Sequence, residues 1–151
     1  MDKKICCFAG HGNLNYKDEL KNLIYNKCIE LITVNYVREF WVGNYGNFDT
    51  MAANIVRELK HEYPEIELNL IIPYLTAEIN NYKEYDNIIM VDIPLNTPKR
   101  YWILKSNQYM INQSNYLVAY VNYSFGGAVK TLEYAKRRKH IVIFNFGNYK
   151  N

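Results

Sequence analysis

The fold is decided by the stretch ICCFAGHG, residues 5–12, in which a continuous apolar run ends in Gly10-His11-Gly12. A short apolar run that stops at a tight, glycine-bearing turn is typical of a parallel strand buried on both faces. Apolar residues at helical spacing follow between residues 20 and 32. The N-terminal part of the chain is therefore predicted to be a strand, a turn and an amphipathic helix.

The same strand and helix alternation continues toward the C-terminus. Further strands are predicted at residues 39–42, 66–72, 88–91, 116–121 and 140–144, and the polar segment 76–85 is assigned to no element. Asn47 is expected to cap the second helix, Pro64 to end it, and Pro98 to open the next. This order predicts an α/β protein with a three-layer, doubly wound, mostly parallel sheet of the Rossmann-like type. One domain is expected over residues 1–147, with a C-terminal tail at 148–151.

Charge and cysteine content narrow the classes of partner. The formal net charge is only +3, and the densest basic run, residues 136–139, falls where a helix is expected to end. We therefore expect no nucleic-acid partner. Three cysteines without metal-ligand spacing predict reduced, buried thiols and no metal site. The N-terminal apolar run is too short for a signal peptide or a membrane span, so a cytoplasmic protein without membrane contact is expected.

Three glycine-bearing loops each follow a predicted strand. They are Gly10-His11-Gly12, Gly43-Asn44-Tyr45-Gly46 and Ser124-Phe125-Gly126-Gly127, the last running into a helix near Ala128. The carboxyl ends of parallel strands meet at one edge of a sheet, where helix N-termini attract anions and glycine lets a phosphate approach. These loops predict a phosphate-binding edge, although the glycines alone also fit simple tight turns. Neither a Walker A motif nor a dinucleotide fingerprint is present.

Four side chains near these loops are candidates for chemistry, each with a structural alternative. His11, expected to be the most exposed histidine, could bind a ligand, act as an acid or base, or fix its own loop. Asp49 could hold a ribose hydroxyl or a substrate amine, or only stabilise a helix N-terminus. Ser124 has no nucleophile-elbow motif around it and suits phosphate binding better than catalysis. Glu133 fits a solvated helix face.

Six segments in order along the chain resemble the SLOG superfamily, the Rossmann-like group that includes the Lonely Guy phosphoribohydrolases and the DprA proteins. They are residues 6–11, 42–49 with Ala52-Ala53, 98–101, 107–111, 114–118 and 126–131. The chain is most similar to small bacterial and phage members of uncharacterised function. The resemblance implies a pocket over the sheet edge, phosphate at Gly126-Gly127, pocket roles for Asp49 and Arg100, and homodimers or higher oligomers. Asn107 lies in a matching segment and is also expected to bind ligand.

The chain departs from the phosphoribohydrolases at positions that carry their catalysis. Ser106-Asn107-Gln108 stands where they have a basic residue, Phe125 replaces a proline, and Glu133 matches the catalytic acid only with a one-residue shift. We therefore predict a protein that binds, and senses or sequesters, a nucleotide or nucleotide-derived signal without a cofactor, as a phage anti-defence sponge would. The alternative is a nucleotide N-glycosidic hydrolase or transferase that uses Glu133 or Asp49. An interaction protein with exposed tyrosines is the third hypothesis.

Overall fold

The computed structural model describes residues 2–73 and 82–150, and it is an α/β fold built on one six-stranded sheet. All strand pairs are parallel, in the order β4-β3-β2-β1-β5-β6. The strands are β1 (Lys4–Gly10), β2 (Val37–Val42), β3 (Glu67–Ile72), β4 (Asn87–Met90), β5 (Tyr116–Tyr120) and β6 (Val142–Asn145). The predicted doubly wound sheet is thus confirmed, and it is parallel throughout.

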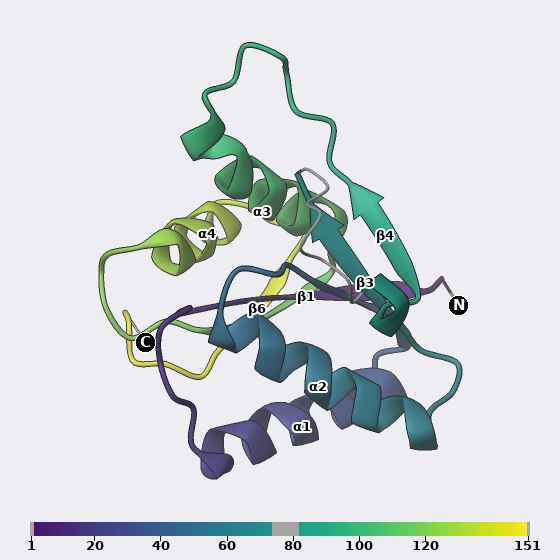
Figure 1. The fold of residues 1–151 in the computed structure, drawn as a ribbon. Helices are drawn as coiled ribbons and strands as arrows, with labels where there is room; N and C mark the ends of the chain where they lie inside the picture. Colours follow the sequence, from purple (N-terminus) through teal and green to yellow (C-terminus); the bar gives the residue numbers. More distant parts are fainter. Residues whose placement is uncertain (1, 74–81, 151) are drawn as a thin grey trace.

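Four helices cover the two faces of the sheet (Figure 1). They are α1 (Asp18–Thr33), α2 (Asn47–Glu62), α3 (Trp102–Gln113) and α4 (Gly127–Lys136), with single 3-10 turns η1 (Tyr82–Glu84) and η2 (Lys99–Tyr101). α1 and α2 pack on one face, and α3 and α4 pack on the other. Successive residues of β1 serve the two cores in turn: Cys6 and Phe8 face α1 and α2, whereas Cys7 and Ala9 face α3 and α4. This alternation explains why the run reads as continuously apolar.

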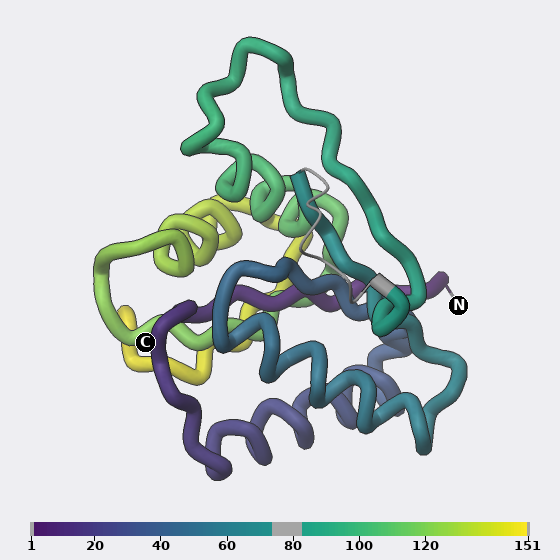
Figure 2. Tube along the Cα trace, in the orientation of Figure 1, coloured from purple at the N-terminus to yellow at the C-terminus, as the bar shows by residue number. Residues whose placement is uncertain are grey.

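The direction in which the chain adds strands to the sheet reverses at β1. From β1 the chain adds β2, β3 and β4 outward, and then a long connection takes it back to β5 on the other side of β1 (Figure 2). β1 and β5 pair in parallel from Cys6 with Tyr116 to Gly10 with Tyr120. Ligands of open α/β sheets bind beyond the carboxyl ends of strands at such a switch point. The topology thus singles out the ends of β1 and β5.

Some local predictions were wrong. Asn47 does not cap α2: the helix begins at Asn47, its N-cap is Gly46, and no side chain caps it. The Asn47 amide instead donates to the carbonyl of Leu14 at 3.0 Å, which ties the loop after β1 to α2. The segment 76–85 lies in part outside the described residues. Of the predicted tail, Asn148 and Tyr149 hydrogen-bond back to Asn122 and Val121.

Candidate functional site

A cavity of about 180 Å³ opens at the carboxyl end of β1. It lies between the loop that precedes α2, the first turns of α4 and the first half of α3. Its lining consists of Phe8, Ala9, Gly10, Gly12, Tyr45, Gly46, Asp49, Ile103, Asn107, Gly127, Ala128 and Thr131. The three predicted glycine loops therefore come together here, since each contributes backbone to the wall.

The glycines of this cavity are there for different reasons. A Cβ at Gly10 would overlap the buried ring of Phe48, and a Cβ at Gly46 would overlap the backbone of Gly12. These glycines let chain segments pack against each other. A Cβ at Gly127, by contrast, would meet nothing within 4 Å, and the φ of Gly127 is not in the left-handed region. Packing and conformation leave glycine at this position unexplained, and they leave open space beside the backbone.

That open space adjoins the N-terminus of α4. Gly127 is the first residue of the helix, Gly126 is its N-cap, and no side chain caps its first amides. Uncapped amides and the helix dipole make such an end attractive to an anion. Asn107 of α3 donates to the Thr131 hydroxyl at 3.2 Å, and that hydroxyl donates to the Gly127 carbonyl at 3.1 Å. Side chains thus hold α3 at a fixed distance from the start of α4.

A second cavity, of about 300 Å³, shares Ile103, Asn107 and Gly127 with the first. Arg100 and Lys130 also line it, and both side chains are exposed. Two cations therefore flank the end of α4 that already favours negative charge. The residues that line either of the two cavities together form the cradle.

Asp49 contributes a carboxylate to the inner cavity. Its carboxylate accepts the Tyr45 N–H at 3.0 Å, but removal from water dominates and raises its pKa from 3.8 to about 6. Asp49 also lies in the first turn of α2, as expected. A half-buried carboxyl that titrates near pH 6 can accept a hydrogen bond from a ligand hydroxyl, and it can exchange a proton near neutral pH.

This raised pKa predicts that Asp49→Asn stabilises the protein at pH 8 by about 1–2 kcal/mol. The folded state disfavours the charged form, so the wild type loses stability as pH rises from about 4 through 6, and the variant does not. Urea unfolding at pH 8 and pH 4 measures both differences, and the gain should vanish at pH 4. Asp18→Asn, at an exposed first-turn acid of α1, is the control and should bring no gain. Equal stability of wild type and Asp49→Asn at pH 8 would refute the assignment.

His11 is buried, so its predicted exposure was wrong. Only 4% of its surface is accessible. Its Nε2 accepts the Asn122 N–H at 2.9 Å, and its carbonyl accepts the Tyr16 hydroxyl. Burial lowers the pKa of the imidazole, in keeping with a neutral, accepting ring. Of the alternatives left open for His11, the contacts favour fixing its own loop to the one after β5.

The other predicted residues lie at varying distances from the cradle. Gly43 is buried behind the cavity wall, where its Cβ would touch Tyr45 and Asp49, and Asn44 is exposed. Ser124 and Gly126 are exposed on the loop before α4 and line neither cavity. Glu133 also lines neither; its carboxylate is 3.8 Å from Lys150. Ligand roles for all these residues stay predictions.

Lys130 and Thr131 are among the cradle residues that were not predicted from the sequence. Both lie one turn into α4, on the side that faces α3. Spacing offered a signal, because residues three and four after Gly127 share its helix face. The apolar side chain of Ile103 also lines both cavities.

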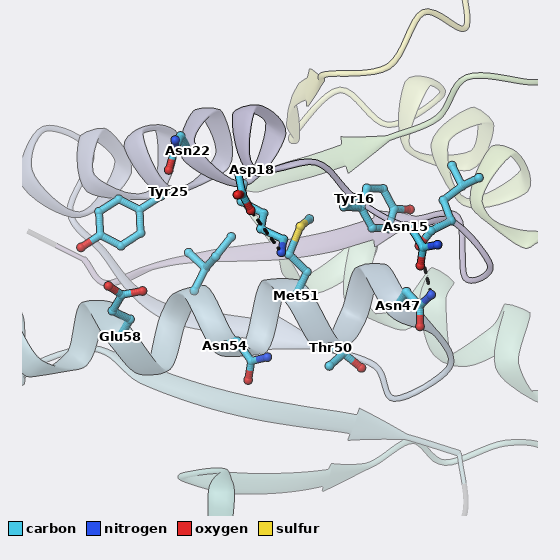
Figure 3. A pocket seen from close by; sticks show the side chains of 13 residues that line it. Asn15, Tyr16, Asp18, Asn22, Tyr25, Asn47, Thr50, Met51, Asn54 and Glu58 are labelled. Atoms are coloured by element: carbon cyan, nitrogen blue, oxygen red, sulfur yellow. Dashed lines mark hydrogen bonds and ion pairs between the residues drawn. The ribbon is translucent and has the colours of Figure 1, made fainter.

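A larger hollow, of about 580 Å³, lies elsewhere, between α1 and α2 (Figure 3). Polar side chains such as Asn22, Asn54 and Glu58 border it together with Tyr25 and Met51. Of the predicted site residues none lines this groove. It is an open groove along two helices that begins beside the loop after β1, and it gathers no excess of positive charge.

Comparison with known proteins identifies the fold. No protein-family model matches the chain, and no curated protein matches it in sequence. Among solved structures, DNA processing protein A from Helicobacter pylori superposes with a TM-score of 0.64 at 14% sequence identity, over 99% of this chain and 68% of that one. That structure was reported for its single-stranded DNA binding mode. The predicted resemblance therefore holds at the level of a Rossmann-like fold shared with a DprA protein.

This neighbour corrects the expectation that nucleic acid is excluded as a partner. The argument rested on a net charge of +3, yet a protein of the same fold binds single-stranded DNA. The net charge of a protein does not describe its local charge, and Arg100 and Lys130 both belong to the cradle. In the part of the chain that is described, no helix has the length and apolarity needed to cross a membrane, and no group of three or more potential ligands is placed to hold a metal.

Proposed function

We propose that this chain binds a nucleotide, or a nucleotide-derived molecule, with its phosphate at the N-terminus of α4. The observation that carries the proposal is the open, uncapped start of α4 at Gly127, flanked by Arg100 and Lys130. A phosphate there would receive backbone amides, the positive end of a helix dipole and two cations. Together with the six matching segments, this supports membership of the SLOG superfamily as part of the proposal.

We further propose that binding proceeds without turnover, as in a protein that senses or sequesters its ligand. Glu133, the acid that the resemblance aligns with catalysis, is turned toward Lys150 and lines neither cavity. Ser106-Asn107-Gln108 stands where the phosphoribohydrolases have their basic residue. A site that has positive charge at the phosphate but lacks the catalytic acid and the basic residue is suited to binding a nucleotide without cleaving it.

Arg100→Ala and Lys130→Ala test the proposal. Each is expected to weaken the binding of adenosine monophosphate about 3- to 10-fold, because each removes a cation next to the phosphate. Calorimetry at low and high salt should show the loss shrinking as salt screens the charges. Lys105→Ala, at an exposed α3 lysine outside both cavities, is the matched control and should bind like the wild type. Identical affinities for all four proteins would reject the site.

A second candidate function, cleavage of a nucleotide N-glycosidic bond, is favoured by Asp49 alone. A carboxyl with a pKa of about 6 inside a ligand cavity is suited to acid–base chemistry. Incubation with nucleoside monophosphates followed by chromatography decides between the two functions. Release of free base that disappears in Asp49→Asn establishes the enzyme. Unchanged nucleotide, together with binding detected by calorimetry, establishes binding without turnover.

A further inference from the structure

Three aromatic rings form a stack on the loops that follow β1 and β5. The ring centroids of His11 and Tyr123 are 3.7 Å apart with planes at 12°, and those of Tyr123 and Phe125 are 4.3 Å apart at 23°. Two rings so close to Tyr123 cannot share one of its faces without overlapping. His11 and Phe125 therefore lie on opposite faces of Tyr123, and Phe125 is the outermost ring.

The inner end of this stack is fixed and its outer end is open. His11 is buried, bonded to the Asn122 N–H, and in edge contact with Tyr120 at 6.3 Å. Phe125, in contrast, exposes 68% of its surface. Since Tyr123 covers one face of the Phe125 ring, the exposed surface is mainly the other face. The exposed Phe125 ring therefore makes no contribution to the core, and one of its faces is accessible.

Two rings of the stack, Tyr123 and Phe125, lie on the loop that leads into α4. Phe125 directly precedes Gly126, the N-cap of α4, whose φ of +96° requires glycine or costs strain. The ring of Tyr123 stacks on His11, and the ring of Phe125 stacks on Tyr123. In the sequence, His11 lies between Gly10 and Gly12, which both belong to the cradle. An aromatic face and a set of phosphate-binding amides are thus presented by neighbouring residues.

We propose that the outer face of Phe125 is the stacking platform for the base of the nucleotide. This inference rests on the proposed function, and it adds base-binding residues that the sequence did not single out. Stacking is tolerant of base identity because every base has a π face, and the larger purines should bind best. The chemistry is shared by a free nucleotide and by an unpaired base in a single-stranded nucleic acid.

The test uses two fluorescent probes, 2-aminopurine riboside monophosphate and a short single-stranded oligodeoxynucleotide carrying one 2-aminopurine. Stacking quenches this base, so fluorescence reports contact with a ring as well as affinity. Phe125→Ala is expected to lose roughly 5- to 150-fold in affinity for the preferred probe, and the quenching with it. Phe125→Trp should restore both. Ribose 5-phosphate, which has no base, should bind Phe125→Ala and the wild type equally.

Val34→Ala is the matched control, because Val34 is 69% exposed and lies just after α1, at the amino-terminal edge of the sheet. The probe that the wild type binds more tightly shows whether the site prefers a free nucleotide or a single-stranded nucleic acid. Undiminished affinity in Phe125→Ala overturns the platform while leaving the proposed function intact. Equal losses for ribose 5-phosphate and the probes also overturn it, because the ring would then only shape the loop. Failure of the wild type to bind any of the three compounds defeats the proposed function itself.

Discussion

Replacing Gly46 by alanine is expected to lower the free energy of unfolding by at least about 3 kcal/mol. The new Cβ would lie less than 3.0 Å from the Cα of Gly12 and 2.9 Å from its carbonyl oxygen. Both atoms belong to backbone, so no rotamer change relieves the overlap. The Gly12 carbonyl also accepts the Asn47 N–H at 2.9 Å, and a displaced loop would lose this bond. Urea unfolding followed by circular dichroism measures the change.

Gly12→Ala is the control for this prediction, since it probes the same contact from the other side. Its Cβ would approach no atom closer than the Tyr45 carbonyl oxygen at 3.3 Å, so the expected loss is below about 1 kcal/mol. Gly127→Ala should leave stability unchanged or raise it slightly, because alanine favours helix. Wild-type stability in Gly46→Ala would show that the two loops are not packed as described.

Replacing Gly127 by aspartate is expected to weaken nucleotide binding at least about 100-fold. The side chain would enter open space at the wall shared by both cavities and place a negative charge where a phosphate is proposed to bind. An acid in the first turn favours the helix, so the variant should fold at least as stably as the wild type. Calorimetry with adenosine monophosphate and thermal unfolding together measure the two effects.

Glu133→Gln provides the matched control on the same helix. Glu133 lines neither cavity, so the loss of its charge should leave affinity unchanged. Gly127→Ala should fall between the wild type and Gly127→Asp, because it fills space without adding charge. Full affinity in a folded Gly127→Asp protein would exclude phosphate binding at the start of α4.

The sheet was predictable because its strands are short apolar runs separated by turn residues. The side chains from Ile5 to Ala9 pack into the cores on both faces of the sheet, so every residue of the run is apolar. The convergence of the glycine loops was predictable for the same reason, since parallel strands end at one edge. Strand ends were displaced by a few residues: β6 begins at Val142, although residues 140–144 had been predicted.

The features that were missed depend on contacts between distant residues. His11 is buried because Asn122 and Tyr123, more than a hundred positions away, bond to it and stack on it. Asn47 does not cap α2 because its side chain donates to the carbonyl of Leu14, which is distant in sequence and comes close only in the folded chain. Such pairings leave no periodic pattern along the chain, so sequence reasoning assigned these side chains by their local surroundings alone.

The most direct test of the cradle is a nuclear magnetic resonance titration of the isotope-labelled protein with adenosine monophosphate, observed at each backbone amide. We expect the largest changes in chemical shift at the backbone amides of Gly10, Gly12, Gly127 and Ala128. The amides of residues in the groove between α1 and α2, such as Asn22 and Asn54, should not shift. Shifts concentrated in that groove, or no shifts at saturating nucleotide, would contradict the account.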